Sequence, residues 1–175
     1  MKKLVLGYLV LSVFLIGCNA ENEYETPVYE GSDLDIGVIG EKPDVREENV
    51  HFQSITFDEL ESNVKDISVE LDAVFIMKEY LEQAGENKYA KVYSESNIPF
   101  FFIESKKAYV PFINDDITYE EFPDVDDQMY ATGIISKGED EFQGWGFGLY
   151  NDTENETNIR STYSNIFEKI ESGGR

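Results

Sequence analysis

The apolar run Ile98-Pro99-Phe100-Phe101-Phe102-Ile103 constrains the fold of this chain more than any other segment. It contains no polar residue that would face water, so a strand built from it must be covered on both of its faces. Pro99 stands at the start of the run, where a strand tolerates the loss of a backbone N–H. A second compact apolar run, from Ala73 to Met77, predicts another strand within residues 69–77. The sequence therefore predicts a folded domain around a buried sheet.

Helix signals stand before and between these two strands. Thr56 and Glu59 have the three-residue spacing of a capping box, in which each side chain accepts a hydrogen bond from the other residue's backbone N–H. A helix is therefore predicted to begin after Thr56. Residues 78–94 are also predicted to be helical, with a break into two pieces at Gly85.

The carboxyl-terminal segment predicts an amphipathic helix. Thr153 and Glu156 repeat the capping-box spacing, and Gly173 stands where a left-handed helix cap is expected. The apolar residues between them follow a helical period: Ile159, Tyr163, Ile166, Phe167 and Ile170. One face of this helix is expected to pack on the sheet.

Three further strand candidates lie at residues 108–113, 129–136 and 142–150, with spacings typical of antiparallel hairpins. Helices and strands thus alternate early in the chain, and hairpins dominate later. The fold class predicted is α/β or α+β, in a single small domain with a mixed, partly antiparallel sheet of about five strands and about three helices.

The amino terminus has the organisation of a signal peptide. Lys2 and Lys3 precede an uncharged apolar run over residues 4–16, which is followed by Gly17 and Cys18. Crossing a bilayer takes roughly 18–20 apolar residues, so this run is too short for a permanent membrane helix. A basic start with a short apolar stretch is typical of a secretory signal.

The residues Leu15-Ile16-Gly17-Cys18 resemble the lipobox of bacterial lipoproteins. The resemblance implies that residues 1–17 are cleaved off between Gly17 and Cys18. It also implies that the Cys18 thiol carries a diacylglycerol and that acyl chains such as palmitate anchor the protein. The expected location is the extracytoplasmic face of the cell membrane, with the membrane as a partner through this lipid.

Residues 18–50 are predicted to form a lipidated amino terminus and a flexible tether. Residues 19–50 hold ten acidic residues against Lys42 and Arg46, and prolines and glycines interrupt every apolar stretch. The patch 34–39 is the exception, because it could pair as an edge strand. The globular domain is predicted to span residues 51–175.

Charge and residue inventory exclude several functions. The chain has 36 acidic and 14 basic residues and a net charge of −22, which repels nucleic acid. Its one histidine is His51, and its one cysteine is Cys18, which the lipid occupies. Nucleophilic triads and zinc sites need more of these residue types, so neither they nor a cofactor are predicted.

Two groups of residues are candidates for ligand binding. In the segment 142–150, strand alternation places Trp145, Phe147 and Leu149 on one face and glycines on the other. This large face either packs in the core or, with Tyr150, forms a stacking platform for a sugar or peptide.

Acidic residues crowd the segment 115–127, where Asp124, Asp126 and Asp127 are weak candidates for a calcium site. The spacing matches no EF-hand loop, and a solvated acidic loop explains the segment better.

The leading functional hypothesis is an anchored lipoprotein whose acidic domain binds or interacts without catalysis, with a protein or envelope glycan partner left open. The alternatives are a cell-envelope hydrolase that uses paired carboxylates, and a calcium-dependent adhesion or sensing module.

Overall fold

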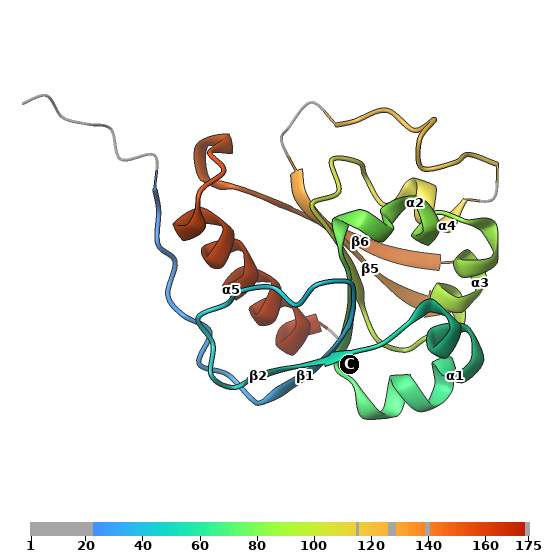
Figure 1. The fold of residues 1–175 in the computed structure, drawn as a ribbon, viewed down its shortest axis with the longest axis horizontal. Helices are drawn as coiled ribbons and strands as arrows, with labels where there is room; N and C mark the ends of the chain where they lie inside the picture. The colour runs from blue at the N-terminus through green and yellow to red at the C-terminus, as the bar shows by residue number, and fades with distance from the viewer. Residues whose placement is uncertain (1–22, 115, 126–128, 139–140, 174–175) are drawn as a thin grey trace, which may run out of the picture.

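The computed structural model describes residues 23–114, 116–125, 129–138 and 141–173. They form a mixed sheet of six strands in the order β2-β1-β3-β4-β5-β6 (Figure 1). The strands are β1 (Leu34–Ile39), β2 (Val50–Ser54), β3 (Ala73–Ile76), β4 (Phe100–Ile103), β5 (Met129–Gly138) and β6 (Glu141–Gly148). The first four run parallel, and β5 and β6 are added antiparallel to β4. The predicted α/β class with a mixed, partly antiparallel sheet is confirmed.

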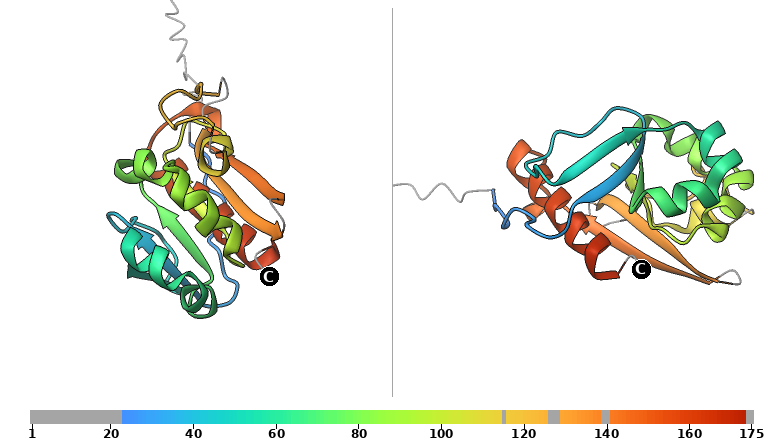
Figure 2. Two further views of the ribbon diagram at one scale, coloured as in Figure 1. Left: turned by 90° about the vertical axis from the view of Figure 1, so that its right-hand side faces the viewer. Right: turned by 90° about the horizontal axis from the view of Figure 1, so that it is seen from below.

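Helices cover both faces of this sheet (Figures 1 and 2). One face carries α1 (Phe57–Glu70), η1 (Lys78–Tyr80), α2 (Leu81–Ala84), α3 (Asn87–Glu95) and α4 (Val110–Ile113). The other face carries α5 (Glu156–Gly173), which follows the short 3-10 turn η2 (Tyr150–Asp152). The arrangement is a three-layer α/β/α sandwich. No helix in the described part of the chain is long and apolar enough to cross a membrane.

Side chains of the central strands alternate between two apolar cores. In β4, Phe100 and Phe102 pack toward α1–α4, while Phe101 and Ile103 pack toward α5. All four are buried, as are all four residues of β3. This double burial confirms the prediction made from the apolar run around Phe100.

Of the two alternatives left open for residues 34–39, the structure shows a strand, β1, and not a flexible tether. This strand lies between β2 and β3, inside the sheet rather than at its edge, and its Ile36 and Val38 are fully buried. The acidic residues before and after β1 made this segment resemble a tether, although the buried residues of the strand are apolar. The domain therefore begins well before residue 51.

Residues 23–33, here called the strap, also contact the domain. The strap runs alongside α5, where the backbone N–H of Thr26 donates to Ser161 Oγ at 3.1 Å. Further along, Tyr29 is 3% exposed and packs against the ring of Phe167, and Ser32 donates to Glu171 at 3.0 Å. The flexible-tether prediction is wrong for these residues.

The connection from β1 to β2 is fixed to α5 by a buried polar cluster. Ser164 Oγ donates to the Glu47 carboxylate at 2.5 Å and accepts from the Arg46 guanidinium at 2.6 Å. Glu47 also accepts from the backbone N–H of Tyr29. This cluster holds strap, connection and helix together, and it satisfies the buried charge of Glu47.

Helix boundaries agree with the sequence in some places and differ in others. The capping box of Thr56 and Glu59 is present, and α2 and α3 are separated at Gly85 as predicted. The segment 108–113, predicted as a strand, contains the short helix α4, whose first turn accommodates Pro111 because no N–H is needed there.

The start and end of α5 also differ from the prediction. Asn155 caps the helix, since its Oδ1 accepts from the backbone N–H of Asn158 at 2.8 Å. The predicted capping box of Thr153 is wrong because the first helical residue is Glu156, which moves the cap two residues along the chain. The helix also extends through Gly173 instead of ending before it.

Gly144 of β6 makes a close approach that predicts a stability difference. A Cβ atom at this position would lie 2.3 Å from the ring of Tyr109, at the start of α4, whereas one at Gly146 would meet only the flexible end of Met129 at 3.2 Å. We expect Gly144→Val to lower the free energy of unfolding by about 1–3 kcal/mol, as overpacking does.

Gly146→Val is the matched control, because it places the same residue in the same strand where the neighbour is able to move. Chemical denaturation of both variants measures the effect. Equal losses at the two positions would show that strand composition, and not contact with Tyr109, decides the result.

Candidate functional site

The parallel strands create a crevice where their carboxyl ends diverge. The connection after β1 crosses the face that carries α5, where Asp44 forms an ion pair with Arg160. The connection after β3 crosses the opposite face through η1, α2 and α3. Since the two connections leave in opposite directions, they leave a gap beyond the ends of β1 and β3. Ligands of open α/β sheets typically bind at such a switch point.

A hollow of about 550 Å³ occupies this position. Its volume falls within the range of roughly 300–1,000 Å³ that small-molecule sites have. It is here called the crevice, and its lining comes from four parts of the fold: the loop after β1, the residues that follow β3 and β4, the start of β5, and the first turns of α5. The lining residues are Glu41, Lys42, Pro43, Asp44, Met77, Glu79, Glu104, Tyr130, Glu154, Asn155, Glu156, Ile159, Arg160 and Tyr163.

Two tyrosines form the deep part of the crevice. Tyr163 of α5 is 2% exposed and Tyr130 of β5 is 9% exposed, with their rings edge to face at 6.1 Å. Burial raises the pKa of both phenols. Both hydroxyl groups therefore stay protonated at neutral pH and offer neutral polar contacts.

Glu104 has an unusual backbone at the end of β4. Its φ of 57° lies in the left-handed region, which non-glycine residues seldom adopt. Its carboxylate forms an ion pair with Lys78 Nζ at 2.8 Å, and this hydrogen bond raises the pKa of Lys78. The conformation directs the chain out of the sheet and leaves Glu104 lining the crevice.

The crevice lining carries six carboxylates and two cationic groups. Arg160 forms ion pairs with Asp44 and with Glu156, the latter at 2.7 Å. Lys42 Nζ lies 2.6 Å from the carbonyl oxygen of Phe52, to which it donates. The lining therefore has an excess of negative charge.

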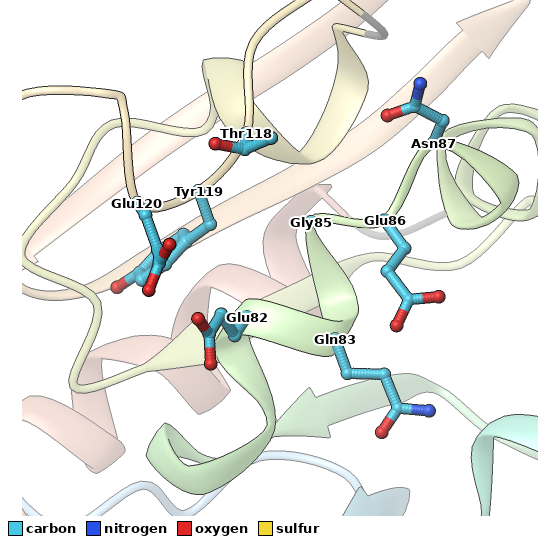
Figure 3. Close-up of a pocket in the computed structure, with 8 residues that line it drawn as sticks. All are labelled: Glu82, Gln83, Gly85, Glu86, Asn87, Thr118, Tyr119 and Glu120. Atoms are coloured by element: carbon cyan, nitrogen blue, oxygen red, sulfur yellow. The ribbon is translucent and has the colours of Figure 1, made fainter.

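Two further hollows continue the crevice along the same edge of the sheet. The first, of about 510 Å³, shares Glu79 and Glu104 with the crevice. The second, of about 560 Å³, shares Glu82, Tyr119 and Glu120 with the first (Figure 3). Shared walls make these three hollows one extended depression.

The hollow in Figure 3 contains the pair of carboxylates that best matches the hydrolase hypothesis. Glu82 and Glu120 are both exposed, and the hydrogen bond between them raises the pKa of Glu82. Glycosidases hold their two carboxyl groups about 5–10 Å apart to accommodate the reacting sugar carbon or water. Carboxyl groups in hydrogen-bond contact leave no such space, so this pair lends the hydrolase no support.

The predicted aromatic platform is not assembled. Trp145 and Phe147 are partly buried and pack against the core on the α5 side, where the stacked rings of Trp145 and Phe101 have centroids 6.2 Å apart. Tyr150 lies apart from them and is 44% exposed, with its ring 5.4 Å from that of Tyr24. Of the two alternatives left open by the sequence, the geometry favours core packing of the large face of β6.

The calcium candidates separate into described and undescribed residues. Asp124 pairs with Lys107 Nζ at 3.3 Å, while Asp126 and Asp127 lie outside the described residues. No cluster of three or more potential metal ligands occurs within the residues that the structure describes.

The residues of the predicted anchor, Gly17 and Cys18, also lie outside the described residues. His51 is exposed on β2 and is not among the residues that line the crevice. Sequence reasoning missed the crevice altogether. The crevice follows from the order of the strands in the sheet, and patterns in a single sequence do not reveal that order.

Comparison with protein-family models, with curated proteins and with solved structures finds no match for this chain.

Proposed function

We propose that this protein is a lipid-anchored, outward-facing domain that binds a positively charged ligand in the crevice without catalysing a reaction. The segment Leu15-Ile16-Gly17-Cys18 supports the anchor. The observation that carries the binding function is the hollow of about 550 Å³ at the switch point of the sheet.

The charge of the crevice supports a cationic ligand. Glu79 and Glu154 are exposed lining residues that enter none of the ion pairs found among the described residues. A cleft lined by one sign of charge concentrates ligands of the opposite sign. The neutral phenols of Tyr130 and Tyr163 add hydrogen-bonding groups at its base.

The residue inventory supports binding rather than covalent catalysis. A serine or threonine nucleophile needs a base beside it, most often histidine, and the one histidine of the chain is outside the crevice. The aromatic Tyr130 and Tyr163 are held protonated by burial, which makes them poor general bases.

Calorimetric titration with spermidine, a flexible polyamine, tests the proposal on the detergent-solubilised lipoprotein. We expect saturable binding that the double substitution Glu79→Gln and Glu154→Gln weakens by about tenfold, which corresponds to roughly 1.4 kcal/mol. Binding should also weaken at about 1 M salt, where the Debye length is about 3 Å.

The matched control is Glu61→Gln with Glu70→Gln, which removes the same charge from exposed positions of α1. An equal loss of affinity in this control would assign binding to net charge and not to the crevice. Absence of saturable binding to the unsubstituted protein would argue against a cationic ligand.

A further inference from the structure

The strap fixes where the anchored chain enters the domain. At its first residues, the backbone N–H of Tyr24 donates to Asn158 Oδ1 at 3.1 Å, and Ser161 Oγ donates to the carbonyl oxygen of Tyr24 at 3.0 Å. Thr26 Oγ1 donates to the carbonyl oxygen of Ser161 at 3.2 Å. These contacts bind the beginning of the strap to the first turns of α5.

The first turns of α5 lie at the same edge of the sheet as the crevice. Asn158 Nδ2 donates to the carbonyl oxygen of Tyr150, which follows the end of β6, and neighbouring Ile159 lines the crevice. The start of the strap, drawn in blue, lies beside the amino-terminal end of α5 (Figure 1). The chain therefore enters the domain at the edge where the parallel strands end, here called the carboxyl edge.

The distance from the proposed lipid to this edge is short. Five residue steps separate Cys18 from Glu23, the first described residue. A fully extended chain covers about 3.3–3.6 Å per residue, so Glu23 stays within about 18 Å of the acylated cysteine. The opposite edge lies farther away, because the ten residues of β5 span roughly 30 Å.

We propose that the carboxyl edge of the sheet faces the membrane and that the crevice opens beside the headgroup layer. This inference rests on the lipid anchor of the proposed function. Docking of the strap removes the long flexible spacer that would otherwise allow the domain to rotate freely.

The surface at this edge has a chemistry that fits the headgroup layer. Tyr24 and Tyr150 are 55% and 44% exposed and form a ring pair there. Tyrosine is enriched at membrane interfaces, where its ring meets the apolar boundary and its hydroxyl group meets water. The phenol pair is the part of the domain that meets the zwitterionic headgroups.

Energy transfer to labelled lipids tests this orientation. The full-length lipoprotein is reconstituted in phosphatidylcholine vesicles that carry an acceptor dye on some headgroups. A single donor dye is placed at Glu154→Cys, on the carboxyl edge, or at Lys137→Cys, at the far end of β5; acylation protects Cys18 from labelling. We expect transfer at least about twofold more efficient from position 154, given the difference of roughly 30 Å.

The control inserts twenty glycine and serine residues between Ala20 and Glu21. Such a spacer has a mean span of about 25 Å, and it should reduce the difference between the two positions. Equal or reversed transfer in the protein without the insert, while it still floats with the vesicles, overturns the orientation and leaves the anchor standing. Failure to float with the vesicles overturns both the anchor and the orientation.

Discussion

A fragment of residues 51–175 should fail to fold, although it contains every helix found in the described residues, four complete strands and all of β2 except Val50. It lacks β1, which lies in the interior of the sheet, and the strap, which covers part of the core beside α5. The side chains lost from the core are Tyr29, Leu34, Ile36, Val38, Ile39 and Val50. Burying each contributes about 1.5–3 kcal/mol, so their loss is on the order of 10 kcal/mol. That equals the whole stability of an ordinary domain, about 5–15 kcal/mol.

Far-ultraviolet circular dichroism with thermal melting measures this result. The fragment 51–175 should show no cooperative transition, whereas the fragment 23–175, which keeps the strap and β1, should melt cooperatively. A cooperative transition in the shorter fragment would mean that β2 and β3 pair stably without β1 between them, contrary to the sheet order found here.

The substitution Cys18→Ala should shift the protein from the membrane fraction to the soluble fraction almost completely. Each buried methylene of an acyl chain contributes about 0.8 kcal/mol to membrane binding, and a diacylglycerol supplies two chains. The substitution removes the thiol that the lipobox resemblance assigns to the lipid. Cell fractionation and incorporation of labelled palmitate measure the two parts of the effect.

Asn19→Ala, one residue further along, is the control and should leave the protein in the membrane fraction with its label. Retention of the Cys18→Ala protein in the membrane, with unchanged palmitate, would contradict the lipid anchor. Retention without palmitate would assign membrane binding to the apolar segment 4–16 itself.

The sequence was most informative where burial demands an uninterrupted apolar run. The run around Phe100 predicted a strand covered on both faces, and the capping box of Thr56 and Glu59 located the start of α1. These features depend on neighbours in the chain. They can therefore be recognised without knowledge of the tertiary structure.

The position of β1 could not be recognised in the same way. Charge patterning assigned residues 18–50 to a tether, but Ile36 and Val38 pack in the core on the α5 side. Asp35, the acidic residue within the strand, is exposed, and the other acidic residues lie outside β1. The average composition of residues 18–50 does not reveal β1, which is only six residues long. Partners far along the chain, such as Ser161 and Glu171, hold the strap in place.

The crevice could not be predicted from the sequence because its lining residues come from separate segments that only the sheet topology brings together. Glu41, Met77, Glu104 and Glu154 are brought together only by the order in which the strands occupy the sheet. Each of them alone is an ordinary surface or loop residue. The same holds for Glu82 and Glu120, because Glu82 lies on α2 and Glu120 lies in a loop that is distant in the sequence.

The strap has a mechanical consequence under the lipid anchor that we propose. A pull on the chain toward the bilayer loads the contacts of Tyr24 first, then those of Thr26, and the buried Tyr29 after them. These contacts can break one after another, because each joins the strap to α5 separately, while β1 stays paired with β2 and β3 on its two sides. Release of the eleven residues of the strap would lengthen the free chain between Cys18 and the domain by about 35–40 Å. Under tension the domain would then extend from the membrane by a fixed step while its sheet stayed folded.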